Sequence, residues 1–190
     1  LTEENKPVWG TCSTFFDSGL LTNGDFENGS DSWIVGVDDN TSAPVVSASG
    51  NSYYSVSVPN AGNPWEVNVS QKVEIIDGNT YTLTFDAWSN VDRTIFAGIG
   101  LSKAPFSADA KPVSITSTRT TYTLTLTATN FGATDARVLF DNGGELGIVN
   151  IDNVSLINAT NAPTYITDAN FRTAINACLT SNPEDGMCSD

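Results

Sequence analysis

The sequence contains no histidine, and only 8 of its 190 residues are lysine or arginine, against 22 aspartates and glutamates. Histidine is the commonest general base and the usual partner of a serine or cysteine nucleophile, so its absence excludes most hydrolytic mechanisms and imidazole metal sites. The formal net charge of −14 repels phosphate backbones and anionic membranes. We therefore expect no nucleic-acid partner and no strongly anionic polysaccharide.

Long apolar runs are missing as well. No segment approaches the roughly 20 apolar residues that a membrane span needs. No basic stretch followed by an apolar one opens the chain, as it would in a signal peptide. We expect no membrane insertion, and any signal sequence was removed or lies outside this piece.

Cysteine is scarce and odd in number, with only Cys12, Cys178 and Cys188. The loop between the last two is short, and the residues at 181–186 have the composition of a turn. This favours a local disulfide between Cys178 and Cys188 in an exported protein. Three reduced thiols are the alternative, and Cys12 has no visible partner.

What the chain does have is a period of two between residues 21 and 157. Leu83, Phe85 and Ala87 alternate with polar residues, and similar runs recur between Gly, Asn and Pro turns. The turn at Asp77–Asn79 has the composition of a β-hairpin. Many short strands with one apolar face predict an all-β domain made of two antiparallel sheets packed face to face.

The two ends of the chain lack this alternation. Residues 1–20 are predicted to be a linker or N-terminal extension. Residues 159–190 are predicted to be a second linker and a short C-terminal helix, because apolar residues recur at helical spacing behind Thr167 and Asp168. The segment 166–175, together with 185–190, resembles the lead-in to BspA-like repeats of bacterial surface proteins. That resemblance implies a fragment of a larger exported protein.

Two motifs bracket the alternating region. The first runs from Leu21 to Gly29 and is followed by Ser32-Trp33, and the second runs from Val149 to Leu156. With the segments at 63–71, 78–88 and 93–99 between them, they resemble a family 4/9 carbohydrate-binding module. The resemblance implies a β-jelly-roll over residues 21–158, whose concave sheet forms a cleft for one glucan or xylan chain without catalysis.

Trp88 is the first candidate for contact with a ligand. If Leu83, Phe85 and Ala87 are buried, Asp86 and Trp88 point to the opposite face of their strand. An indole among polar side chains suits a sugar, which has an apolar C–H face and a rim of hydroxyl groups. In the alternative interpretation, Trp88 only covers a sheet edge.

Other candidates are expected around the same cleft. Asn68 and Glu66 are predicted to lie with Asp86 on one polar face of neighbouring strands. Trp65 follows Asn63-Pro64, which places it at the mouth of a strand, whereas strict alternation with Val67 and Val69 would turn it inward. The resemblance implies that Trp65 is a second aromatic platform and that Trp33 lies in the core. Three further candidates have weaker grounds: Tyr53, which alternates with Tyr54; Arg93, which donates to hydroxyl groups or ends a strand in solvent; and Asn142, which closes one end of the groove or lies in a plain hairpin loop.

The resemblance also implies a structural calcium ion. Carried over residue by residue, its ligands would be Asp25, Glu27, a carbonyl at Gly50 or Asn51, and Asp152. Ile151 and Val154 fall out of strict alternation around Asp152, as they would at a β-bulge. Solvated acids at strand ends are the alternative.

These observations predict a noncatalytic module that holds one neutral β-glucan chain, with a preference for laminarin-type β-1,3-glucan. We expect a monomeric module within a secreted or cell-surface bacterial protein that has several modules. One alternative is a calcium-stabilised structural or adhesion domain. Another is a glycoside hydrolase that uses Glu66 and Asp86 as its two carboxyl groups.

Overall fold

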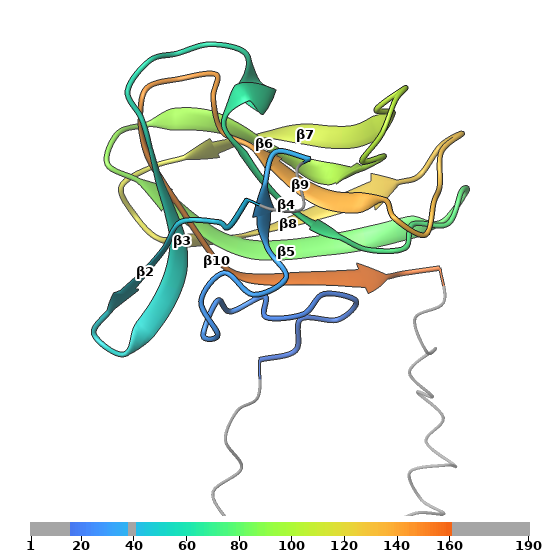
Figure 1. The fold of residues 1–190 in the computed structure, drawn as a ribbon, viewed down its shortest axis with the longest axis horizontal. Coiled ribbons are helices and arrows are strands. Elements are labelled where there is room, and N and C mark those ends of the chain that lie inside the picture. Colours follow the sequence, from blue (N-terminus) through green and yellow to red (C-terminus); the bar gives the residue numbers. More distant parts are fainter. Residues whose placement is uncertain (1–15, 38–40, 161–190) are drawn as a thin grey trace, which may run out of the picture. The chain divides into compact units, whose positions relative to one another are not determined.

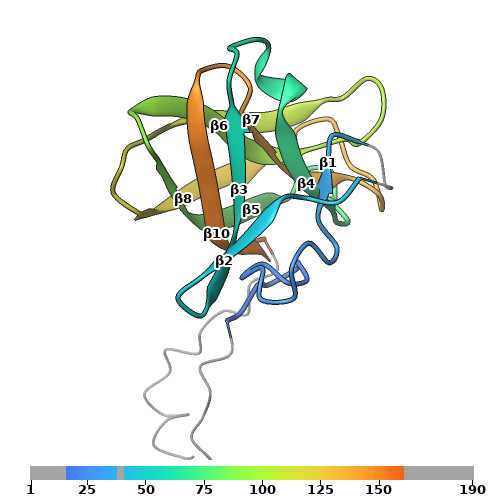
Figure 2. The same ribbon diagram turned by 60° about the vertical axis from the view of Figure 1, so that its left-hand side comes forward.

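Ten strands form two antiparallel five-stranded sheets in the computed structural model, which describes residues 16–37 and 41–160. These residues belong to one unit that ends at Thr160. Figures 1 and 2 show the strands in two layers. In order across the first sheet, the strands are β1 (Ile34–Val35), β4 (Asn68–Lys72), β9 (Arg137–Asp141), β6 (Arg93–Gly100) and β7 (Ala108–Ile115). In order across the second sheet, they are β2 (Val45–Ala48), β3 (Asn51–Val58), β10 (Gly147–Asn158), β5 (Thr80–Ser89) and β8 (Thr120–Thr127).

The prediction of two antiparallel sheets is confirmed. The predicted C-terminal helix, the BspA-like segment and all three cysteines lie outside the described residues. Within the described ranges, no helix is long and apolar enough to cross a membrane.

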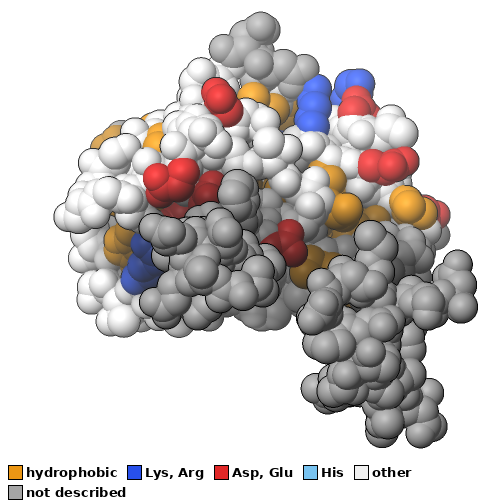
Figure 3. Space-filling model, turned by 90° about the horizontal axis from the view of Figure 1, so that it is seen from below, with side chains coloured by type: hydrophobic (Ala, Val, Ile, Leu, Met, Phe, Trp, Pro, Cys, Tyr) orange, Lys and Arg blue, Asp and Glu red, His pale blue; other side chains and the backbone are white. Residues whose placement is uncertain are grey.

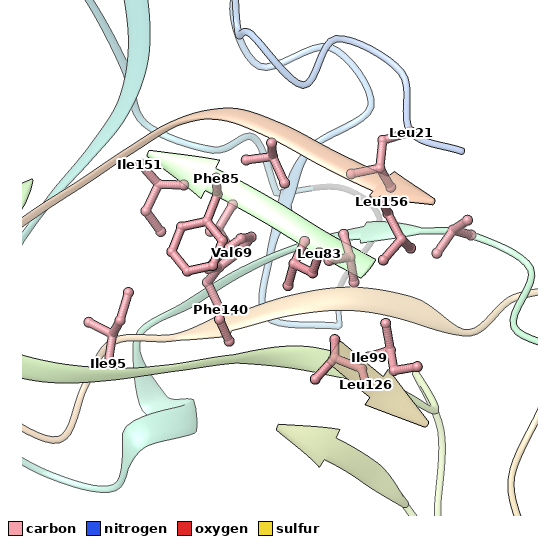
Figure 4. Close-up of a cluster of buried hydrophobic side chains, with 14 of the residues drawn as sticks. Leu21, Val69, Leu83, Phe85, Ile95, Ile99, Leu126, Phe140, Ile151 and Leu156 are labelled. Carbon is pink, nitrogen blue, oxygen red and sulfur yellow. The ribbon is translucent and has the colours of Figure 1, made fainter. Parts of the chain in front are cut away.

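The core lies between the sheets and is built from the apolar half of each alternating strand. In β5, Leu83, Phe85 and Ala87 are fully buried, while their neighbours are partly exposed. Phe85 meets Phe140 of the first sheet edge to face, with 4.9 Å between ring centroids. Figure 4 shows a cluster of these buried hydrophobic side chains packed between the two layers. Strand periodicity thus fixes which side chains fill the interior.

The N-terminal motif, Leu21 to Gly29, packs against β10 and forms turns rather than a strand. Asn23 and Phe26 have φ angles of 54°, which interrupt an extended chain. The turns drive Phe26 into the core, where it stacks on Trp33 with a centroid distance of 4.8 Å. Trp33 is only 2% exposed, and its Nε1 donates to the Asn23 carbonyl at 2.8 Å. The prediction that Trp33 is a core residue is confirmed.

The first and last parts of the domain are joined by backbone hydrogen bonds. Leu20 N donates to the Leu156 carbonyl at 2.8 Å, and Leu156 N donates to the Ser18 carbonyl at 3.2 Å. Gly19 and Leu156 pair in parallel, with the Gly19 Cα so close that a Cβ there would lie 2.3 Å from the Leu156 oxygen. Further along β10 the register shifts between Asp152 and Ser155, which confirms the bulge predicted at this position.

Candidate functional site

A groove crosses the outer face of the first sheet. Its middle row consists of Ser70, Leu139, Gly98 and Ala110, which face one another across β4, β9, β6 and β7. On one side runs a row of Asn68, Asp141, Phe96 and Pro112, and on the other a row of Lys72, Arg137, Gly100 and Ala108. Because most of the middle row is small or apolar, it forms a low floor between two edges that carry larger polar groups.

Two exposed aromatic side chains line this groove. Trp65 is 62% exposed and precedes β4, and Phe106 is 52% exposed and precedes β7. Trp65 therefore stands beside the row that contains Asn68, and Phe106 beside the row that contains Ala108. The space that they help to enclose has a volume of ≈ 590 Å³. The predicted position of Trp65 at the mouth of a strand is confirmed.

A short 3₁₀ turn, η2 (Pro64–Glu66), holds Trp65 in place. The Glu66 carboxylate accepts hydrogen bonds from Asn63 N at 3.0 Å and from Asn63 Nδ2 at 2.9 Å. Asn68 Nδ2 donates to the Trp65 carbonyl at 2.6 Å. Glu66 and Asn68 both line the groove, as predicted for residues of the cleft, but each also fixes the turn that presents the indole.

Three polar atoms in the groove are buried without a hydrogen-bond partner in the described part of the chain. They are Asn68 Oδ1, Arg137 Nε and Asp141 Oδ1. Burial raises the pKa of Asp141, and the positive charge of Arg137 only partly offsets this effect. Burial likewise lowers the pKa of Arg137. Buried polar groups are normally paired, so these three atoms are available to water or to a polar ligand that enters the groove.

Sequence analysis placed Asp141 only in a turn that could close one end of the groove, and it did not identify Arg137, Leu139 or Phe106 as groove residues. The signal was present for Arg137, Leu139 and Asp141, because Val138 and Phe140 are apolar and alternation places their neighbours on the opposite face. Phe106 lies in the loop between β6 and β7, where no period applies.

Trp88 and Asp86 lie on the other sheet. They belong to β5 in the second sheet, whereas Asn68 belongs to β4 in the first, and Glu66 immediately precedes that strand. The prediction that Asp86, Asn68 and Glu66 share one face is therefore wrong, because the chain crosses from one sheet to the other between β4 and β5. The proposed hydrolytic pair, Glu66 and Asp86, is wrong for the same reason.

Trp88 points away from the core, as predicted, but its ring is partly covered. The Arg119 guanidinium carbon lies 4.8 Å from the ring centroid, and the Tyr53 ring lies 5.0 Å away. Tyr53 thus belongs to the outer face of the second sheet rather than to the groove. In Figure 3, which views the molecule from below Figure 1, most of the visible described surface is uncharged side chain or backbone.

The polar groups next to Trp88 satisfy one another. Asp86 accepts from Arg119 Nη2 at 2.8 Å, Thr121 Oγ1 at 2.6 Å and Asn153 Nδ2 at 2.9 Å. Arg119 Nη2 also donates to Asp152 at 2.7 Å. We call these five residues the Arg119 cluster. Burial alone would raise the pKa of Asp86, but these hydrogen bonds lower it below its ordinary value. Little hydrogen-bonding capacity is left in the cluster for a ligand.

Arg93 and Asn142 are buried, so the predicted positions of both are wrong. Arg93 is 4% exposed and donates to the carbonyls of Asn142 and Gly147. Asn142 is fully buried. Both side chains hold the connection between β9 and β10, and neither reaches a cleft or solvent.

Comparison with known proteins identifies a family and several similar folds. The family model described as a carbohydrate binding domain, of families 4 and 9, matches residues 18–143. The chain belongs to this family. A solved family 4 carbohydrate-binding module ("CBM4 structure and function") is 27% identical, covers 70% of this chain and 99% of its own, and has a TM-score of 0.57. The N-terminal cellulose-binding domain of Cellulomonas fimi β-1,4-glucanase C is 25% identical, covers 75% and 96% of the two chains, and has a TM-score of 0.54. The second N-terminal cellulose-binding domain of the same glucanase, 21% identical with a TM-score of 0.59 and coverages of 75% and 95%, shares the fold. A comparison with curated proteins gave no match.

Only some of the ligands expected for a calcium ion in this carbohydrate-binding module lie together in the structure. Glu27 Oε1 accepts from Ser52 N at 2.8 Å, and Asp152 Oδ2 accepts from Asn51 Nδ2 at 2.9 Å, so these segments do lie together. The side chain of Asp25 contributes only a long contact of 3.5 Å from Glu27 N.

The charge at this position argues against a bound cation. Asp152 is fully buried, and the oxygen that accepts from Asn51 also accepts from Arg119. A guanidinium group thus already neutralises the carboxylate and would repel a metal ion beside it. Among the described residues, no three acidic or cysteine side chains gather as metal ligands. The side chains of Asp25 and Asp152 therefore do not fit the implied site of Asp25, Glu27, Gly50, Asn51 and Asp152. The calcium ion stays a prediction of the resemblance, and from the charge at Asp152 we expect that none binds.

A chelator is expected to leave the melting temperature of the module unchanged. A calcium ion held at 1,000 times its Kd would contribute about 4.1 kcal/mol to the free energy of unfolding, so its removal would be plain in a thermal scan. The measurement is differential scanning calorimetry in EDTA and in millimolar CaCl₂. A fall in the melting temperature with EDTA that calcium restores and magnesium does not would show that Glu27 and Asp152 do bind the ion.

Proposed function

We propose that the groove binds one chain of a neutral β-glucan, which lies across β4, β9, β6 and β7. The observation that carries this proposal is the pair of exposed aromatic residues, Trp65 and Phe106, beside a floor of small side chains. Aromatic rings pack against the apolar C–H face of a sugar, and the polar atoms at the groove edges meet its hydroxyl groups. Membership of a carbohydrate-binding family supports the same ligand class.

The shape of the groove favours a single chain over a crystalline surface. Trp65 and Phe106 stand beside opposite edge rows of the floor rather than in one flat strip. The sequence favours a β-1,3-linked chain, whereas the likeness to a domain named as cellulose-binding supports β-1,4 linkage. Both are β-glucans, so our proposal is made at that level and the experiment separates the linkages.

We infer that the role is noncatalytic targeting by a monomeric module of a secreted or cell-surface bacterial protein. Modules of this kind typically act outside the cell, in agreement with this role. The competing function is a structural or adhesion domain. Such a domain would share the sandwich but would have no use for an exposed indole beside unpaired polar atoms.

Affinity electrophoresis tests the proposal. The full chain is run through native gels that contain laminarin, lichenan, xylan, hydroxyethylcellulose or alginate. We expect retardation in at least one neutral β-glucan gel and none in alginate, because the chain carries a net charge of −14. Equal mobility in all five gels and in a sugar-free gel would contradict the proposal and favour a structural or adhesion domain.

A further inference from the structure

We propose that Arg137 and Asp141 set the specificity of the groove by reading opposite edges of one bound sugar. In this assignment Arg137 Nε donates to a sugar oxygen at one edge, and Asp141 Oδ1 accepts from a hydroxyl group at the other. Leu139 lies beneath the ring between them. This assignment rests on the proposed function and adds to it the residues that distinguish one neutral sugar from another.

The register of β9 places the three side chains in line. Arg137, Leu139 and Asp141 face the same side because Val138 and Phe140 point into the core. At about 3.4 Å of rise per residue, the Cα atoms of Arg137 and Asp141 are roughly 13 Å apart. The two side chains therefore flank a ring that lies over Leu139, rather than meeting each other in an ion pair.

Each charged group lacks a partner where one is needed. Arg137 Nε and Asp141 Oδ1 are both buried and unpaired, and no ion pair joins either side chain to another described residue. An unpaired buried group weakens the free protein, whereas a ligand that supplies the missing partner gains the full hydrogen bond. Asn68 Oδ1 lies in the same row as Asp141 and is also unpaired, so that edge offers a second acceptor.

The charges of the groove are mixed, which favours a neutral sugar. The enclosed space is lined by one cation, Arg137, and two anions, Glu66 and Asp141, and Lys72 lies in the edge row beside Arg137. A carboxylate on the ligand would be attracted by Arg137 and repelled by Glu66 and Asp141. Hydroxyl groups meet both kinds of atom without that repulsion, because each hydroxyl is a donor as well as an acceptor.

Isothermal titration of Arg137→Met and Asp141→Asn with the β-glucan that retards the wild type tests this assignment. We expect Arg137→Met to raise Kd about tenfold or more, because the donor is lost. We expect Asp141→Asn to raise Kd severalfold, because a neutral amide oxygen accepts more weakly than a carboxylate. We also expect neither melting temperature to fall, because the desolvation cost that each change removes outweighs the attraction between Arg137 and Asp141 that is also lost. A residue that only supports the fold would show the reverse, with a lower melting temperature. Asp92→Asn, at an exposed turn outside the groove, is the matched control for the loss of one negative charge.

The outcomes separate the two proposals. If the wild type binds no polysaccharide, the proposed function itself fails. If the wild type binds and Trp65→Ala weakens binding, but both β9 variants bind like the wild type, only the assignment of Arg137 and Asp141 fails. Tighter binding of a uronate-bearing chain than of the neutral one, lost in Arg137→Met, would overturn the neutral specificity.

Discussion

Trp65→Ala is expected to weaken binding of a soluble β-glucan by about 30- to 150-fold, equivalent to roughly 2–3 kcal/mol. The indole is the largest exposed apolar surface beside the groove, and its turn is fixed before ligand arrives by Asn63, Glu66 and Asn68. Little conformational entropy is therefore lost when a sugar packs against it. Isothermal titration with an oligosaccharide of the preferred linkage measures the change.

Trp88→Ala is the matched control, since it removes an indole from the outer face of the opposite sheet. We expect its Kd to stay close to that of the wild type. We also expect Trp65→Ala to unfold within about 0.5 kcal/mol of the wild type, because an exposed side chain contributes little to packing. Loss of binding in Trp88→Ala, with Trp65→Ala unaffected, would move the site to the second sheet.

Arg119→Met is expected to lower the free energy of unfolding by about 2–3 kcal/mol at neutral pH, because a fully buried carboxylate loses its countercharge. Asp152 would then lie opposite Asp86 on the neighbouring strand without a cation between the two carboxylates. Part of the guanidinium is exposed, and water that enters there limits the loss. Urea unfolding, followed by tryptophan fluorescence, measures the difference.

The effect should shrink as pH falls. Burial raises the pKa of Asp152 in the folded protein. Its ionised form therefore lowers stability as pH rises above the pKa of the unfolded chain, and this cost disappears once the carboxyl group is protonated. The pKa of Asp86 is lowered in the folded protein. Its ionised form therefore adds stability at a pH above the pKa of the unfolded chain, and this stability is lost as pH falls through the pKa of the folded protein. Both pKa shifts therefore predict that wild type and Arg119→Met differ less in free energy of unfolding at acid pH.

Lys103→Met removes a different ion pair and provides the comparison. Lys103 and Asp135 are paired at an exposed position, where water screens the interaction. We expect a much smaller loss than for Arg119→Met. Equal losses in the two variants, or a gap for Arg119→Met that widens in acid, would contradict the role given to Arg119.

Periodicity in the sequence predicts which face of a strand is buried, and it does so well in this chain. Leu83, Phe85 and Ala87 fill the core as alternation requires, and Trp88 points the other way. Alternation does not predict which sheet a strand joins. Asn68 and Asp86 lie on consecutive strands, yet they face opposite sides of the molecule because the chain crosses between layers.

The groove itself depends on contacts that only the folded chain contains. Its edges meet through the pairing of β9 with β4 and β6, which brings Arg137 and Asp141 beside strands far away in sequence. Arg93 was misplaced for a related reason. An arginine at the start of a strand usually faces solvent, but here it turns inward to two backbone carbonyls, that of Asn142 in the loop before β10 and that of Gly147 at the start of β10.

The parallel pairing of Gly19 with Leu156 affects how the module bears mechanical load. When the two ends of the described domain are pulled apart, tension runs along its chain. Because these two segments run side by side in the same direction, such tension slides one past the other and strains both backbone bonds at once. Shear of this kind resists extension better than peeling, in which bonds break one after another, so we expect the fold to hold under flow while the ligand stays bound.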